Sequence, residues 1–286
     1  MFTDDILKQN YLDTGFYIAA YTLITFLGLT VGSFLNVCIC RIPKGESITE
    51  KASHCVKCGA SIRIYDLIPV LSWFFLRGKC RECGEKISGR YPLVEALNTA
   101  AYIILFTWFD INIHSIIMCI ASSILICIAF VDIDTLEIDP AALIALAVLG
   151  IADAVFAFFF PEFMLSGLLT IPDRLIGAVC ISVPFFVIGE IFALITKKIT
   201  GEKVRGIELG DTFLMAASGL LIGWQATVVA AFMGIILASI GGIISKLRTG
   251  ESKIPFGPYL AAGIFLAAMF GQVITNWYLT LLAPKQ

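Results

Sequence analysis

Long, uninterrupted apolar runs are the feature that most restricts how this chain can fold. Runs approaching the ~20 residues that an α-helix needs to cross a bilayer recur along the sequence. Of its 286 residues, 58% are hydrophobic and only 15% are charged. A membrane β-barrel would instead show alternating strands of ~10 residues. The sequence therefore predicts an all-α, polytopic membrane protein embedded in a lipid bilayer, and we expect no nucleic-acid partner.

About eight transmembrane helices are expected, near residues 16–40, 93–109, 115–131, 141–160, 174–196, 212–223, 225–244 and 257–282. The segment 212–245 is the least regular, because only about a dozen apolar residues precede Gly223, which is short for a span. One long span with a re-entrant piece is the alternative. We favour two spans, because a single span would move the basic residues of 245–256 to the outer side.

Basic residues are concentrated in three of the predicted loops. Of the 20 Lys and Arg residues, ten lie in 41–92, four in 197–211 and three in 245–256. The positive-inside rule places these loops in the cytoplasm. Both chain termini are then predicted to lie outside the cytoplasm.

Four carboxylates follow the third apolar run, in the segment FVDIDTLEIDP at 130–140. Asp132 is predicted at the cytoplasmic edge of the membrane. Glu137 and Asp139 are expected in a solvated turn. Pro140 is expected to begin the next helix, because proline suits a first helical turn.

A second acidic residue is predicted in the same layer. Asp211 follows the cytoplasmic loop GEKVRGIELG and begins a membrane helix, where a helix N-cap is its simplest role. Asp132 and Asp211 at one membrane edge could not both ionise easily, so we expect them to share a proton. An aspartic protease uses such a pair; a proton or ion relay is the alternative. Asp153 and Glu190, inside predicted spans, are weaker candidates.

Two Cys-x-x-Cys motifs, separated by 21 residues, lie in the largest predicted cytoplasmic loop. Cys55, Cys58, Cys80 and Cys83 supply four thiolates, the ligand set of a structural tetrahedral zinc. Disulfides are the rival interpretation, but the cytoplasm disfavours them. His54 is expected to be a bystander. The zinc would fold a loop that is too short to build its own core.

Several short motifs occur in a specific order and spacing. They are GSFLNVCICRIP (32–43), IPVLSWFFLRGKCRECGEKISGRYPLVEALN (68–98), DIDTLEID (132–139), LGD (209–211), GLLIGWQ (219–225) and IPFGPYLAAG (254–263). Together they resemble the bacterial type IV prepilin peptidase family of intramembrane aspartic proteases. Members of this family are bifunctional leader peptidases and N-methyltransferases. The resemblance extends over most of the chain.

This resemblance implies that the protein cuts the basic leader from type IV prepilins and type II secretion pseudopilins at the cytoplasmic face of the bacterial inner membrane. It also implies methylation of the new N-terminal amine with S-adenosylmethionine. The two proteolytic aspartates of the family correspond to Asp132 and Asp211. Asp134 and Glu208 are candidates for tuning this pair, and Glu95 is a candidate partner of the amine in methyl transfer.

The sequence departs from the family pattern at two places. The family's Gly-x-Gly-Asp reads Glu-Leu-Gly-Asp at 208–211, so Glu208 replaces the first glycine. The family's Ile-Pro-Asp reads Ile-Asp-Pro at 138–140, which could shift the start of the following helix. Neither departure removes a catalytic carboxylate.

Three domains are expected. They are an N-terminal segment with the first transmembrane helix (1–40), a zinc-binding loop associated with methyltransferase activity (41–92), and a transmembrane peptidase domain (93–286). Two other functions remain open at this point. One is a zinc-containing membrane transporter that uses the acids as a proton path, and the other is a non-catalytic scaffold for pilin assembly.

Overall fold

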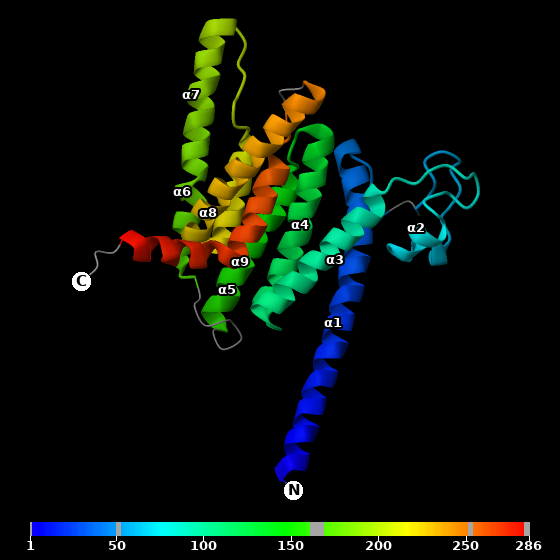
Figure 1. Ribbon diagram of the computed structural model, residues 1–286. Coiled ribbons are helices and arrows are strands. Elements are labelled where there is room, and N and C mark those ends of the chain that lie inside the picture. Colours follow the sequence, from blue (N-terminus) through cyan, green and yellow to red (C-terminus); the bar gives the residue numbers. More distant parts are fainter. Residues whose placement is uncertain (1, 50–52, 161–168, 251–253, 283–286) are drawn as a thin grey trace. The chain divides into compact units, whose positions relative to one another are not determined.

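The computed structural model describes residues 2–49, 53–160, 169–250 and 254–282, which are predominantly helical and contain no β-strand (Figure 1). Seven stretches within these residues are long and apolar enough to cross a membrane. They are Thr14–Lys44, Arg90–Phe109, Ile113–Thr135, Pro140–Phe159, Ile171–Thr200, Leu209–Arg248 and Gly257–Leu282. The all-α, polytopic fold predicted from the apolar runs is confirmed.

The chain forms two compact units, Met1–Trp108 and Phe109–Gln286. The helices that begin in the first unit are α1 (Phe2–Arg41), η1 (Ile42–Lys44), η2 (Ile64–Leu67), α2 (Leu71–Phe75) and α3 (Arg90–Phe109). Those of the second are α4 (Ile113–Thr135), α5 (Pro140–Phe159), α6 (Ile171–Cys180), α7 (Ser182–Thr200), α8 (Leu209–Thr249) and α9 (Gly257–Leu282). The functional division of the chain near residue 92 stays a prediction.

Helices α1 and α3 pack closely through two glycines of α1. A Cβ atom added to Gly28 would lie 2.8 Å from the Cα of Thr99, and one added to Gly32 would lie 2.7 Å from the Cα of Glu95. Asn98 Nδ2 donates to the carbonyl oxygen of Gly28 at 2.8 Å. Small residues and an interhelical hydrogen bond are the usual means by which membrane helices associate. They fix α1 against α3 near the start of α3.

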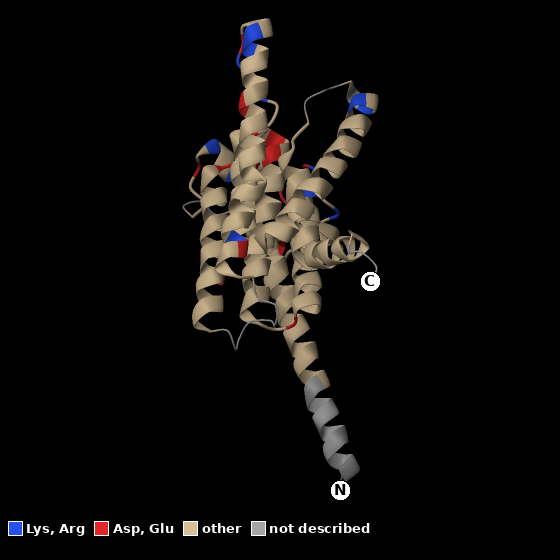
Figure 2. Ribbon diagram, turned by 90° about the vertical axis from the view of Figure 1, so that its left-hand side faces the viewer, with Lys and Arg blue, Asp and Glu red and all other residues tan. Residues whose placement is uncertain are grey.

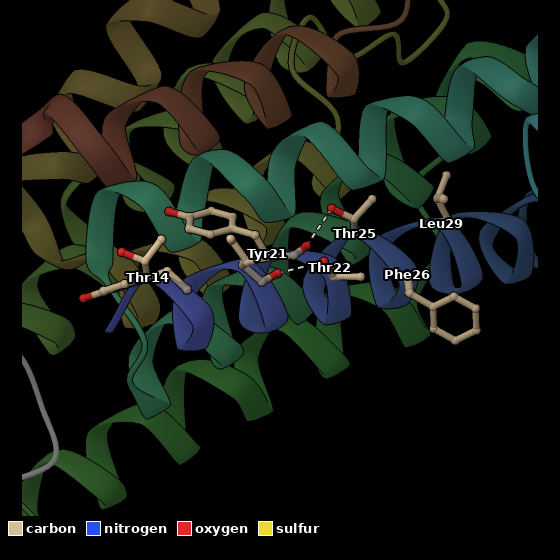
Figure 3. Close-up of a pocket in the computed structure, with 8 residues that line it drawn as sticks. Thr14, Tyr21, Thr22, Thr25, Phe26 and Leu29 are labelled. Carbon is tan, nitrogen blue, oxygen red and sulfur yellow. Dashed lines mark hydrogen bonds between the residues drawn. The ribbon is translucent and has the colours of Figure 1, made fainter. Parts of the chain in front are cut away.

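A shallow pocket lies along α1 (Figure 3). The hydroxyls of Thr22 and Thr25 each donate at 2.7 Å to a backbone carbonyl one turn earlier. The lining contains no charged side chain, so we interpret the pocket as a helix surface that faces lipid. It is lined by Thr14, Tyr17, Ile18, Tyr21, Thr22, Thr25, Phe26 and Leu29.

Helix α8 is interrupted at Gly223, whose φ of 74° and ψ of 170° lie outside the helical region. Glycine adopts a positive φ at little cost, whereas other residues do not. The break leaves two helical arms, 209–222 and 224–249, and α8 changes direction between them (Figure 1). Two separate spans are predicted here from the sequence. The break at Gly223 lies between these two predicted spans, and the seven candidate spans counted in the described residues take Leu209–Arg248 as one stretch.

Basic residues gather at one end of the second unit. The last turn of α7 carries Lys197 and Lys198, and the last turn of α8 carries Lys246 and Arg248. Figure 2 shows both helix ends on the same side of this unit. This distribution agrees with the predicted cytoplasmic loops. The placement of the termini stays a prediction.

A buried ion-pair cluster joins four helices of the second unit. The carboxylate of Asp153 in α5 is fully buried, and it pairs with Arg174 of α6 at 2.6 Å and with His114 of α4 at 2.9 Å. Arg174 also donates to the carbonyl oxygen of Leu220 in α8 at 3.0 Å. Leu220 lies just before the break at Gly223, where carbonyls lose their helical donors. The structure thus gives Asp153 a structural role.

Replacing Asp153 by alanine is expected to lower the free energy of unfolding by about 3 kcal/mol, because Arg174 would stay buried without its carboxylate. Thermal unfolding of the protein in detergent measures this loss. The double variant Asp153→Ala/Arg174→Ala removes both charges and should recover part of the stability. Equal stability of wild type and Asp153→Ala would contradict the structural role.

Candidate active site

Asp132 and Asp211 come together within the second unit. Asp132 lies in the last turn of α4 and Asp211 in the first turn of α8. Both are buried, with 5% and 6% of their surfaces exposed. The two carboxylates are close enough to interact electrostatically. The structure therefore places in one site the two aspartates that the sequence predicts at one membrane edge.

The start of α9 fixes the position of Asp132. The backbone N–H of Gly257, the first residue of α9, donates to Asp132 Oδ2 at 2.7 Å. A Cβ atom added to Gly257 would lie 2.7 Å from the same oxygen. Gly257 is a site residue that the sequence reasoning did not single out, although it lies in the IPFGPYLAAG motif.

Asp211 is held by the turn before α8. The sequence suggests an N-cap role for Asp211, but the N-cap of α8 is Glu208 and Asp211 occupies the third helical position. Its Oδ2 accepts a hydrogen bond from the backbone N–H of Glu208 at 3.3 Å. Each of the two aspartates is therefore anchored by one backbone amide through Oδ2.

Glu208 occupies a backbone conformation that needs no glycine. Its φ of −79° and ψ of 160° are ordinary extended values, which any residue adopts. The replacement of the family's glycine is therefore compatible with this turn. Glu208 interacts electrostatically with both Asp132 and Asp211. A tuning role for Glu208 stays a prediction.

The other acids of the 130–140 segment are exposed or cap a helix. Asp134 and Glu137 are exposed. Asp139 is the N-cap of α5, where its Oδ2 accepts the backbone N–H of Ala142 at 3.2 Å. Pro140 begins α5, as predicted. A tuning role for Asp134 stays a prediction.

Glu190 of α7 holds the loop that leads to Asp211. Its carboxylate pairs with Lys203 at 3.2 Å and with Arg205. Both partners lie between α7 and α8. The structure thus uses this intramembrane carboxylate as an anchor for the loop, and not as a member of the aspartate pair.

The four cysteines of the two Cys-x-x-Cys motifs meet in the first unit. The sulfur atoms of Cys55, Cys58, Cys80 and Cys83 all lie within 4.8 Å of one another. Cys55 Sγ and Cys83 Sγ are 3.9 Å apart, close to the edge of about 3.8 Å of a tetrahedron with Zn–S bonds of ~2.3 Å. The donor set and its spacing fit a zinc ion held by four thiolates.

The two halves of this cluster have the same backbone fold. The N–H of Cys55 donates to the carbonyl of Ala60 at 2.9 Å, and the N–H of Cys80 donates to that of Glu85 at 2.8 Å. A glycine with φ near 70° follows each second cysteine. Backbone N–H groups of Cys58 and Lys57 lower the pKa of Cys55 to about 6, whereas the other three thiols help to raise the pKa of Cys83 to about 12.

Removing the cysteine cluster should abolish zinc binding. In a Cys58→Ser/Cys83→Ser protein, the zinc content is expected to fall from about one ion per chain to near zero, because two of four ligands are lost. Elemental analysis of the purified protein measures the content. Limited proteolysis should cut residues 53–89 faster in this variant. Cys40→Ser, outside the cluster, is the control, and zinc retained at the wild-type level by the double variant would rule the site out.

Glu95 forms a buried contact at the start of α3. Its Oε2 accepts the backbone N–H of Val70 at 2.6 Å. Val70 is the N-cap of α2 and has an unusual φ of 60°, which is strained for a β-branched residue. Glu95 therefore ties α2 to α3. Its predicted part in methyl transfer remains a proposal.

Two family models match this chain. The family model described as Bacterial Peptidase A24 N-terminal domain matches residues 26–109, and the model of the Type IV leader peptidase family matches residues 119–243. No solved structure is similar at a significant level.

Curated relatives cover almost the whole chain. A "Prepilin leader peptidase/N-methyltransferase" of Aeromonas hydrophila is 31% identical, over 91% of this chain and 94% of the relative. A protein of the same name from Pseudomonas aeruginosa is 32% identical over the same shares. One from Bacillus subtilis is 29% identical, over 90% of this chain and 97% of the relative. This chain therefore belongs to the type IV leader peptidase family.

Proposed function

We propose that this protein cleaves the basic leader from type IV prepilins or type II secretion pseudopilins and methylates the new N-terminal residue. The observation that carries the proposal is the buried pair of Asp132 and Asp211, brought together from the ends of two membrane helices. The names of the relatives support both activities. The proposed location is the bacterial inner membrane, with both termini outside the cytoplasm.

The aspartate pair performs the hydrolysis in this proposal. One carboxylate takes a proton from water, and the other, protonated, polarises the scissile carbonyl. Asp132 and Asp211 each use Oδ2 to accept a backbone N–H, so each keeps Oδ1 for the water and the carbonyl. The apolar helix of the substrate lies in the bilayer, and its cleavage site reaches the pair at the cytoplasmic edge.

The first unit carries the methyl transfer in this proposal. Cys55, Cys58, Cys80 and Cys83 hold a structural zinc that folds the loop. Glu95 keeps α2 fixed to α3 through Val70 and is the candidate for positioning the substrate amine. S-adenosylmethionine is the proposed methyl donor.

A cleavage assay tests the proposed function directly. The purified protein in detergent is incubated with a prepilin that carries a Gly–Phe junction, and mass spectrometry follows the product. We expect loss of the leader, and a gain of about 14 Da, one methyl group, only when S-adenosylmethionine is present. A folded, zinc-loaded protein that leaves the prepilin intact would favour the transporter or the scaffold instead.

A further inference from the structure

An apolar surface of the zinc-bearing loop is exposed in the first unit. Ile64 is 88% exposed and Phe75 is 82% exposed. Leu71, Phe74 and Phe75 share one face of α2, because they are three and four residues apart. Exposed apolar patches of this kind mark sites of interaction with a membrane or a partner. The apolar surface consists of Ile64, Tyr65, Ile68, Leu71, Phe74 and Phe75.

The loop presents this surface in a fixed way. Trp73 donates through Nε1 to the carbonyl of Ile87 at 3.1 Å, and its ring packs near Gly78 and against Phe74. Asp66 forms a two-point ion pair with Arg81, with distances of 2.8 and 2.6 Å. This pair lowers the pKa of Asp66. The aromatic side chains are therefore exposed although the loop around them is internally bonded.

The contact between Glu95 and Val70 sets the depth of this surface. Glu95 lies in the second turn of α3, a candidate membrane span that starts at Arg90. Its bond to Val70 attaches α2 at the level where α3 enters the bilayer. An exposed aromatic surface at this level meets the boundary between lipid headgroups and acyl chains.

The charges near the surface fit an anionic leaflet. Four basic residues lie in 63–81, and two of them are ion-paired, Arg81 with Asp66 and Arg63 with Glu82. Arg77 and Lys79 follow α2 directly and are exposed. Basic side chains beside an apolar surface strengthen binding to anionic lipids. A soluble partner would not require this combination at the membrane level.

We propose that the apolar surface of residues 64–75 docks into the cytoplasmic leaflet and inserts its aromatic side chains among anionic lipids. The zinc-bearing loop would then be held flat on the membrane beside α3. This inference concerns the first unit and does not depend on the aspartate pair.

Photo-crosslinking in the full-length protein tests the docking. A benzophenone-bearing phenylalanine replaces Phe75 in one protein and Val56 in another, and both are placed in nanodiscs with anionic lipid. Val56 is 89% exposed in the same loop but lies outside the apolar surface. We expect about tenfold more lipid adducts at position 75 than at position 56, and fewer at position 75 when the nanodisc lacks anionic lipid.

The same benzophenone-bearing residue at position 64 is a second probe of the surface, for the case that the protein substituted at position 75 misfolds. Zinc content reports whether each protein is folded. Equal lipid labelling at positions 56, 64 and 75 would overturn the proposal. Adducts with an added prepilin in place of lipid would overturn it too, since the surface would then be a substrate site. Adducts with the chain's own helices would equally exclude docking into lipid.

Discussion

Changing either Asp132 or Asp211 to asparagine should reduce prepilin cleavage by about 10²–10⁴-fold, because the remaining carboxylate cannot both accept a proton from water and polarise the carbonyl. Asparagine and aspartate have nearly the same shape, so each variant should keep the packing of these buried positions. The rate of leader loss, followed by mass spectrometry with purified protein and prepilin, gives the size of the effect.

Methyl transfer by the two aspartate variants shows whether their loss of cleavage comes from the missing carboxylate or from misfolding. A pilin that has already lost its leader should be methylated by Asp132→Asn and Asp211→Asn at the wild-type rate, because the methyl transfer is assigned to the first unit. Glu137→Gln, at an exposed acid of the same turn, should cleave normally. Cleavage at the wild-type rate by either aspartate variant would remove that residue from the mechanism.

Much of this site could be predicted from the sequence, because its signals are local. The apolar runs indicate where helices begin and end, and the basic loops indicate the side of the membrane. Together they place Asp132 and Asp211 at the same depth without any knowledge of packing. The zinc site could be predicted for the same reason. Each Cys-x-x-Cys motif forms its own turn, and a tetrahedral zinc takes the four cysteines of two such turns.

Other contacts could not be predicted, because their partners lie far apart in the sequence. Asp132 and Gly257 are separated by 125 positions, and no local pattern pairs an aspartate with one backbone amide. The role of Asp153 could not be predicted from the sequence for the same reason. An isolated acid in an apolar run suggests function, and only the packing of α4, α5 and α6 shows that Arg174 and His114 are its partners.

Glu208 shows that a sequence motif alone does not reveal the backbone conformation at each of its positions. The family pattern has glycine there, and glycine often signals a positive φ or a close approach. The observed φ of −79° shows that this turn requires no positive φ. At Gly223 the glycine does have a positive φ of 74°, which breaks α8 between the two spans that the sequence predicts.

Replacing Gly257 by alanine should lower the rate of cleavage by about 10²-fold with little change in KM, because misplacing a catalytic group by ~1 Å has an effect of this size. The three atoms nearest to the added Cβ all belong to Asp132, and the closest is Oδ2 at 2.7 Å. Gly257 has no positive φ, so the backbone itself tolerates alanine. The substitution therefore acts on the position of the Asp132 carboxylate.

Gly242→Ala is the matched control. A Cβ atom at Gly242, in the second arm of α8, would lie 3.1 Å from the terminal Cδ1 of Ile254, a flexible methyl group that can move aside. This variant should cleave prepilin at close to the wild-type rate, and both variants should methylate a pre-cleaved pilin normally. If Gly257→Ala cleaves as fast as Gly242→Ala, the amide of Gly257 does not position Asp132. Because the hydrogen bond and the crowding involve the same carboxylate, a selective loss of cleavage would identify α9 as the element that holds Asp132 in its reactive position.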